Sequence, residues 1–414
     1  MALSSNPLTE VWAGAADAGD PRTATGRVHT SSGEATGMRK LIENVIAYPI
    51  DCEVRLGSVA AALLTSQNRD IPDGMAVCDN PDRRSGAVGE PCTRCGNCRG
   101  WTIRERHYHR LANEYAFVSG QALLQFDMSG KEPESRDELQ LLARCGDYLD
   151  FVFGYAGYQY RPVEAAAGKA AVFGAIRDSI DDGMPVLLQY KADQLWLLVT
   201  GYDDTTALYG YDGGAYADYY QMMTPAPDCY EGKLFHATNW HDAMTRAVIV
   251  GGRCTPSVSI DDVVVRNASL MKPIFDNDYY GRAADYIHDG GNYRDEGDNL
   301  RTQANLIDDF IGVPIGGRSI AGWFLLDQLE RNCEAKYRDP FARIAGCCCD
   351  IHEISWVAWR GVGRYEQEPE RFHAKLTDPL YRKMLAGVVK LVGYKDRHVY
   401  EGLCDSANRV EARR

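Results

Sequence analysis

Residues 183–213 place the tightest limits on how this chain can fold. Two apolar runs of strand length, 185–190 and 195–201, are separated by a short polar break. A third run, 208–211, follows a turn rich in Asp and Thr. Continuous apolar runs are typical of strands that are buried on both faces. The segment therefore predicts three neighbouring strands joined by tight turns.

Helical and strand patterns flank this segment. Residues 169–182 carry apolar side chains at helical spacing and end at Gly183, a natural helix stop. Downstream, residues 247–250 (AVIV) predict a closing strand, and upstream the aromatic run 151–160 (FVFGYAGYQY) is strand-like. These patterns together predict a mixed α+β fold in the first part of the chain.

Cys52 stands directly before residues 54–67, whose apolar side chains fall on one face of a helix. A thiol at a helix N-terminus gains thiolate character from the helix dipole and the unpaired backbone N–H groups. The same N–H groups can stabilise an oxyanion. For a single cysteine, the alternative role is that of a small buried hydrophobic residue.

The order of these features resembles a known group of domains. A helix, Gly-Met-Pro-Val, two strands, Gly-Tyr-Asp-Asp and a strand ending in Asp resemble the papain-like domain of the bacteriocin-leader-processing peptidases. They are closer to the N-terminal domain of butirosin-biosynthesis-protein-H-like proteins. The resemblance covers residues 38–255 and implies a papain-like cysteine-peptidase fold followed by an all-helical C-terminal domain.

The same resemblance implies a chemistry. Cys52 matches the nucleophile, and Asp212 matches the residue that orients the catalytic base. The activity implied is that of a thiol acyltransferase or an amide or thioester hydrolase. Its substrate would be a small molecule or a peptide in biosynthesis.

The base itself is missing from its expected place. The histidine of the family should begin the second hairpin strand, where this chain has Leu195 and Trp196. An indole nitrogen is only a donor, so Trp196 cannot take a proton from a thiol. Two alternatives remain open: another imidazole folds into the site, or the domain is a non-catalytic relative that keeps the groove. The imidazoles considered are His107, His109, His236 and His241.

A cluster of cysteines predicts a metal site. Cys92, Cys95 and Cys98 are spaced so that three thiolates can face one centre, and Cys78 can supply the fourth ligand. Structural zinc is favoured, with an iron–sulfur cluster as the alternative metal centre. His107 and His109 are possible substitute ligands, and a set of reduced thiols in a loop is the alternative without metal.

The composition bears on which partners the protein can bind and on the cellular compartment in which we expect it. The formal net charge of −13 argues against nucleic acid as a partner, because phosphate binding needs clustered Lys and Arg. No apolar stretch approaches the length that spans a membrane, and no signal peptide opens the chain. We therefore expect a cytoplasmic protein whose 13 cysteines are thiols or metal ligands.

The chain divides into three predicted parts. Residues 1–37 are expected to be a disordered N-terminal tail, residues 38–255 a papain-like domain with a Cys-rich insertion at 70–100, and residues 256–414 a helical C-terminal domain. Within the last part, the acidic, Tyr-rich residues 276–299 are expected to form a solvent-facing loop or helix connector. Helical spacing occurs at 300–311, 320–337, 340–359 and 379–392.

Overall fold

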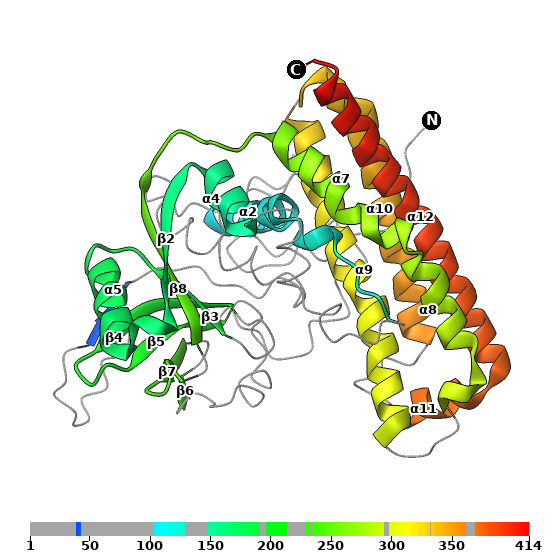
Figure 1. Cartoon of the computed structure of the whole chain (residues 1–414), viewed down its shortest axis with the longest axis horizontal. Helices are drawn as coiled ribbons and strands as arrows, with labels where there is room; N and C mark the ends of the chain where they lie inside the picture. Colours follow the sequence, from blue (N-terminus) through cyan, green and yellow to red (C-terminus); the bar gives the residue numbers. More distant parts are fainter. Residues whose placement is uncertain are drawn as a thin grey trace, which may run out of the picture.

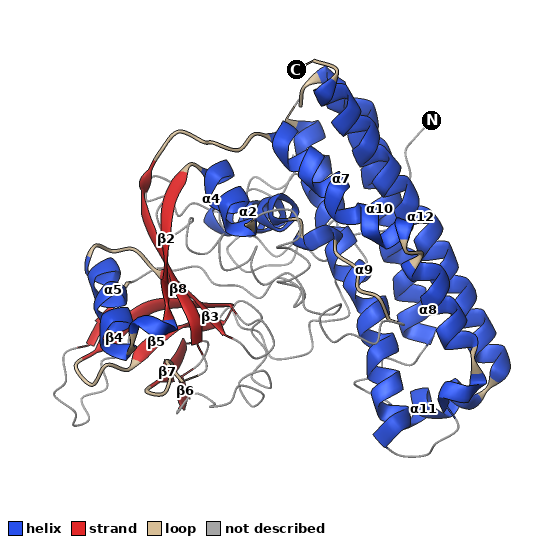
Figure 2. Cartoon of the chain, in the orientation of Figure 1, coloured by secondary structure: helices blue, strands red, loops and turns tan. Residues whose placement is uncertain are grey.

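The structure is a computed structural model that describes residues 39–42, 103–128, 147–190, 196–212, 229–231, 234–242, 244–293, 298–331, 333–361 and 369–413. An antiparallel sheet with its covering helices forms one side of the molecule, and a bundle of long helices forms the other (Figures 1 and 2). The chain is therefore a mixed helix-and-sheet protein with a helical C-terminal region. Among the described helices, none is both long and apolar enough to cross a membrane.

The sheet has eight described strands. Seven follow the order β2-β8-β3-β4-β5-β7-β6, and the eighth, β1, pairs with the C-terminal end of β4, past the part of β4 that pairs with β3. Every pairing is antiparallel. The strands are β1 (Arg39–Leu41), β2 (Tyr158–Glu164), β3 (Val186–Tyr190), β4 (Trp196–Asp203), β5 (Leu208–Asp212), β6 (Cys229–Glu231), β7 (Leu234–Ala237) and β8 (Met244–Arg253).

The three predicted strands of the opening segment are confirmed as β3, β4 and β5, which are neighbours in the sheet. The predicted helix before them is confirmed as α5 (Lys169–Asp181), which ends just before Gly183 in the left-handed region at φ 79°. The predicted strand at 247–250 is part of β8. Instead of closing an edge, β8 lies between β2 and β3.

Three residues of the Gly-Tyr-Asp-Asp motif, Gly201, Tyr202 and Asp203, are held by contacts with β1, α5 and the turn. Gly201 pairs with Leu41 of β1, and a Cβ at position 201 would lie 2.5 Å from the Lys40 carbonyl oxygen. The Tyr202 hydroxyl donates to Asp181. The Asp203 carboxylate accepts the backbone N–H of Thr205 at 2.9 Å and the Tyr209 hydroxyl at 3.0 Å. Each of these residues therefore has a structural role in the hairpin.

The prediction of a strand across 151–160 is wrong for its first half. Residues Tyr148–Ala156 form helix α4, and strand β2 begins only at Tyr158. Asp147 caps the helix by accepting the Leu149 N–H at 2.9 Å, and Gly157 ends it with φ 73°. The buried residues of α4 are Tyr148, Leu149, Val152 and Phe153, and a short apolar run of this kind does not distinguish a helix from a strand.

The helical region contains longer helices than predicted. Pro314 does not end α9, because the Gln125 side-chain amide donates to the Phe310 carbonyl at 3.1 Å, the group that a residue-314 N–H would otherwise bind. The remaining helices are α2 (Ile103–Ser119), α7 (Ile260–Asp276), α8 (Tyr279–His288), α9 (Asp298–Glu330), α10 (Ala335–Gly361), α11 (Pro369–Thr377) and α12 (Pro379–Glu411), with short 3-10 helices at Gln121–Leu123, Ala165–Ala167 and Gly290–Tyr293.

The prediction of a solvent-facing loop or connector at 276–299 is also wrong in part, because α8 lies within it. Tyr279, Tyr280, Ala283, Ala284 and Ile287 of α8 are buried. Their spacing places them on one face of the helix. The acidic residues that flank α8 and Asp285 within it masked this apolar stripe in the sequence.

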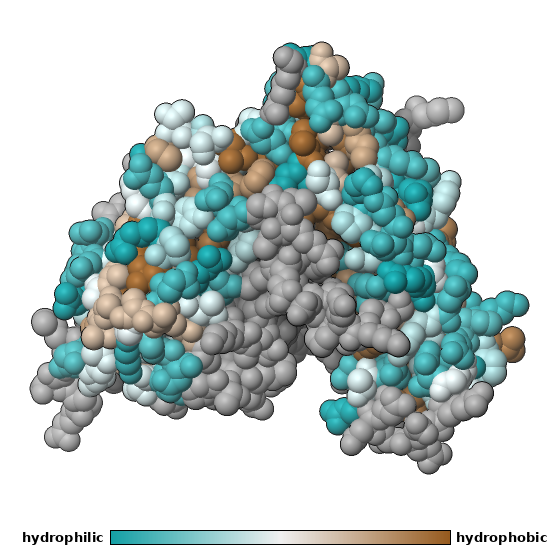
Figure 3. All heavy atoms as spheres, viewed as in Figure 1, coloured by the Kyte–Doolittle hydropathy of each residue, from teal (hydrophilic) through white to brown (hydrophobic). Residues whose placement is uncertain are grey.

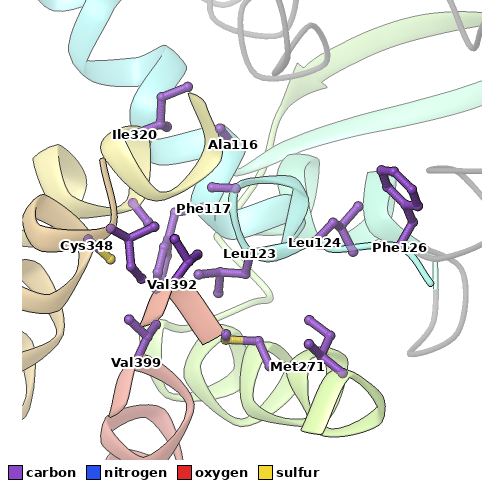
Figure 4. Close-up of a cluster of buried hydrophobic side chains, with 14 of the residues drawn as sticks. Ala116, Phe117, Leu123, Leu124, Phe126, Met271, Ile320, Cys348, Val392 and Val399 are labelled. Atoms are coloured by element: carbon purple, nitrogen blue, oxygen red, sulfur yellow. The ribbon is translucent and has the colours of Figure 1, made fainter. Parts of the chain in front are cut away.

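Two hydrophobic cores lie on opposite faces of the sheet. On one face, Val186, Leu197 and Val199 pack with apolar side chains of α5. On the other face, Leu187, Trp196 and Leu198 belong to a larger core that continues into the long helices. The alternation follows from the two-residue period of a strand. Figure 4 shows part of the larger core, with labelled side chains from α2, the segment after it, α7, α9, α10 and α12: Ala116, Phe117, Leu123, Leu124, Phe126, Met271, Ile320, Cys348, Val392 and Val399.

A buried ion pair joins the helices to the segment after α2. The Arg318 guanidinium donates to both carboxylate oxygens of Asp396, at 2.6 and 2.8 Å, and both side chains are fully buried. Arg318 also donates to the Ala122 carbonyl, and the Tyr280 hydroxyl donates to Asp396 at 2.8 Å. Because the charges are paired and hydrogen-bonded, their burial is tolerated and fixes how these helices meet.

Candidate functional site

The predicted nucleophile and the predicted metal ligands lie outside the described residues. These are Cys52 for the nucleophile and Cys78, Cys92, Cys95 and Cys98 for the metal. The described part of the predicted site is the end of the sheet at which β4 begins and β5 ends. Asp212 is the last residue of β5, and its backbone pairs in register with Leu197 of β4.

Trp196 begins β4, at the place where the resemblance implies an imidazole. It is only 2% exposed and belongs to the larger core. Its ring meets Tyr148 of α4 edge to face, with the ring centres 6.4 Å apart. The neighbouring Leu197 belongs to the core on the α5 face. The side chains of Trp196 and of Leu197, which pairs with Asp212, therefore face opposite sides of the sheet.

Three adjacent strands place polar and aromatic side chains beside one another here. Gln189 of β3 pairs in register with Trp196 on one side and with Arg246 of β8 on the other. The Arg246 guanidinium donates to the Gln189 side-chain oxygen at 2.7 Å and to the Tyr148 hydroxyl at 3.0 Å. Gln189 is buried and Arg246 is half-buried. The network fixes the side chains around the indole and offers donors and aromatic rings, with no imidazole among its four members.

Of the four histidines considered as alternative bases, the structure describes the side chain of one, His241. His107 and His109 lie in α2 and His236 lies in β7, but their side chains are outside the described set. The ring of His241 meets Trp240, whose side chain belongs to the core on the α5 face, and its Nε2 lies 3.3 Å from the Ala165 carbonyl oxygen. His241 is therefore on the opposite face of the sheet from Trp196.

Sequence reasoning missed a second polar cluster, where α2 meets α4. Burial raises the pKa of the Glu114 carboxyl, although its hydrogen bond with Tyr155 acts in the opposite direction. The charges of Arg110 and Arg331 also act to lower this pKa. The signal in the sequence was a single carboxylate within the apolar part of a helix, Leu111 to Ser119. A carboxyl group in this setting is a proton donor or acceptor of altered strength.

Three of the described cysteines are consecutive residues of α10. Among the residues that the structure covers, no group of three or more His, Cys, Asp or Glu could hold a metal ion. Cys347, Cys348 and Cys349 follow one another in α10; Cys348 is buried and the other two are half-buried. Burial raises the pKa of all three thiols, which disfavours the reactive thiolate form.

Comparison with known proteins was negative: no protein-family model, no curated protein and no solved structure matched the chain.

Proposed function

We propose that this chain is a papain-like protein without the conventional thiol–imidazole pair, and that it binds a peptide or small molecule in the groove of that fold. The observation that carries the proposal is the buried indole of Trp196 at the start of β4, held by Tyr148. A thiol needs a base within hydrogen-bond reach to form and keep the nucleophilic thiolate. Trp196 cannot act as that base.

Two features support retention of a binding groove. The hairpin β3–β4 and strand β5 have the order and antiparallel pairing that the resemblance implies. At the same end of the sheet, Arg246 and Gln189 supply polar groups beside aromatic rings. Few well-placed polar groups among apolar walls are typical of sites that bind peptides and small molecules. The groove would therefore recognise its ligand by donors and aromatic contacts and leave it unchanged.

A second candidate function is thiol acyl transfer with Cys52 as the nucleophile and Asp212 as the orienting residue. It is supported by the position of Asp212 at the end of β5, the strand that follows the hairpin. This function requires an imidazole from a residue whose side chain is not described, such as His107 or His109.

An acyl-donor assay separates these two functions. Wild type and Cys52→Ser are mixed with p-nitrophenyl acetate and with an N-acetylcysteamine thioester, and intact-mass and peptide mass spectrometry follow acylation. We expect both proteins to release product at the same rate, with no acyl group that turns over on Cys52. A burst and steady turnover that disappear in Cys52→Ser would establish the second function instead.

We also propose that Cys78, Cys92, Cys95 and Cys98 bind one structural zinc ion. The support is their spacing, which suits four thiolate ligands. Elemental analysis of the purified protein should give about one zinc per chain, and Cys95→Ser should reduce it. A fully folded wild type that contains neither zinc nor iron would refute this site.

A further inference from the structure

The outer face of α12 carries an apolar stripe that the fold does not bury. Four of its large apolar residues are exposed, at 76%, 49%, 44% and 58%: Leu380, Met384, Leu391 and Tyr394. With Gly387 and His398 they recur at alternating spacings of four and three residues. This is the heptad pattern of a seam at which one helix packs against another. Single exposed apolar residues are common on protein surfaces. A series of them in heptad register is not expected by chance and indicates a contact surface.

The opposite face of α12 is the one that packs into the helical bundle. Leu385, Val389, Val392, Val399 and Leu403 are buried there. Figure 1 shows α12 along the outer margin of the helical half, away from the sheet, and Figure 3 shows that the visible surface of this half is mostly hydrophilic. A helix that uses one face in a core normally presents polar residues on the other. The outward stripe is therefore a second, separate apolar face.

Gly387 lies at the middle of the stripe. A Cβ at this position would meet no atom within 4 Å, and the residue does not have a positive φ. Glycine within a helix costs about 1 kcal/mol relative to alanine. Because neither backbone geometry nor packing against the described residues requires it, the glycine suits a hole that receives a large side chain from a facing helix.

The charges beside the stripe define what can cover it. Lys383, Lys390 and Arg397 are exposed and recur every seven residues along one flank. The ion pair of Lys390 with Asp285, at 3.2 Å, joins two side chains that are each more than half exposed, so it is weak. On the other flank lies Lys395, which is half-buried and paired with Asp350 at 2.6 Å. Heptad-paired helices place such flanking residues beside those of the partner.

The positive charge on this flank argues against a second copy of the chain as the helix that covers the stripe. In an antiparallel pair centred on Gly387, Lys383 of one copy would lie beside Lys390 of the other. In a parallel pair, Lys390 of one copy would lie beside Lys395 of the other. Both arrangements bring like charges together, which destabilises a helix pair. The stripe is also narrow, two positions in seven, which is typical of a helix seam rather than of a helix that lies on a membrane.

We propose that the outer face of α12 is a docking site for one amphipathic helix of a partner protein, with apolar heptad positions and Glu or Asp on its flanks. The contact runs from Leu380 to His398, where the His398 ring lies 2.9 Å from Glu401 and marks the end of the apolar stripe. At 1.5 Å per residue this is about 27 Å of helix, or a little under three heptads of partner. The proposal rests on none of the residues that support the proposed groove.

The test uses the full chain and two fluorescein-labelled peptides of three heptads, with Leu at the a and d positions. One peptide has Glu at the e and g positions and the other has Lys. By fluorescence anisotropy, we expect the acidic peptide to bind at least about tenfold more tightly than the basic one, or about 1.4 kcal/mol. The difference should shrink as salt is raised.

Two variants make the result specific to this face. The double substitution Lys383→Glu and Lys390→Glu should invert the preference, so that the basic peptide binds more tightly. Leu391→Glu should abolish binding of both peptides, while circular dichroism confirms an unchanged fold. Equal binding of the two peptides, or an unchanged preference in the double variant, would overturn the proposal.

Two further measurements decide between occupants. In sedimentation velocity, the wild-type protein should not self-associate through α12. It should also not co-sediment with vesicles of phosphatidylcholine and phosphatidylserine. Self-association that Leu391→Glu removes would assign the face to a second copy. Vesicle binding that the same variant removes would assign it to a membrane. Either result would overturn the proposal of a partner helix.

Discussion

The two ends of strand β4 differ in how their residues are used. At the Asp203 end, Gly201 contacts β1, the Tyr202 hydroxyl donates to Asp181 of α5, and Asp203 accepts hydrogen bonds within the turn. At the Trp196 end, the indole packs against Tyr148 of α4, and Tyr148 is linked to Arg246 of β8 by a hydrogen bond. The residues at one end are therefore used for structure, while at the other end a buried indole occupies the position where the resemblance implies a base.

The largest effect is expected from Trp196→Ala. The indole fills a position that is 2% exposed and packs against Tyr148, so its removal should lower the free energy of unfolding by about 3–5 kcal/mol. Denaturant unfolding followed by circular dichroism measures the change. As a control, Trp323→Ala removes an indole that is 42% exposed and should cost much less. Equal losses in the two variants would contradict the structural role of Trp196.

Gly201→Ala should have the next largest effect. A methyl group at this position would lie 2.5 Å from the Lys40 carbonyl oxygen, so β1 or β4 must move. We expect a loss of about 1–3 kcal/mol in the free energy of unfolding. Gly174→Ala is the matched control, because a Cβ at Gly174 would meet no atom within 4 Å. A loss confined to the control would refute the pairing of β1 with β4.

Asp203→Asn tests the turn through its pH dependence. Burial acts to raise the pKa of the Asp203 carboxyl, but hydrogen bonds from Thr205 and Tyr209 outweigh it and lower the pKa. A lowered carboxyl pKa stabilises the fold above the unfolded value of about 3.9, and this contribution is lost as pH falls through the folded value.

We therefore expect Asp203→Asn to cost about 1 kcal/mol at pH 7. The difference from wild type should shrink toward pH 3 when thermal unfolding is followed over that range. A difference that grows in acid would show that the carboxylate does not stabilise the turn.

Tyr148→Phe should have the smallest effect. The ring and its contact with Trp196 remain, but Arg246 loses the hydroxyl that accepts its hydrogen bond at 3.0 Å. We expect a cost of about 0.5–1.5 kcal/mol in denaturant unfolding. Tyr148→Ala should cost several times more, since it also removes the ring. Identical costs would mean that the hydroxyl, and not the aromatic contact, secures this end of the sheet.

The sequence was most informative where structure is local. Helix α5 and strands β3 to β5 were predictable from apolar runs and from the stop at Gly183. Helix α4 was not, because its cap at Asp147 and the burial of Phe153 are compatible with a strand pattern as well. The continuity of α9 through Pro314 depends on Gln125, which lies far away in sequence. Contacts of this kind leave no periodic signal.

The candidate site was predictable only in part. The residue type at position 196 is visible in the sequence, and it alone raises doubt about a thiol–imidazole pair. Its packing against Tyr148, and the hydrogen bonds of Arg246 to Tyr148 and Gln189, could not be predicted, because they depend on where α4 lies and on the register of β3 and β8. The predictions for Cys52 and for the cysteine cluster concern residues outside the described ranges and stay predictions.

The pH dependence of Cys52 alkylation tests the central claim most directly. The rate of iodoacetamide labelling at Cys52 is followed by peptide mass spectrometry between pH 5 and pH 10, with Cys52→Ser to confirm the labelled peptide. Without an imidazole partner, the rate should rise with pH as an unassisted thiol ionises, toward a midpoint of about 8.5 or somewhat lower at a helix N-terminus. A rate already on its plateau at about pH 6 is the behaviour of a thiolate paired with an imidazolium, and it would contradict the account.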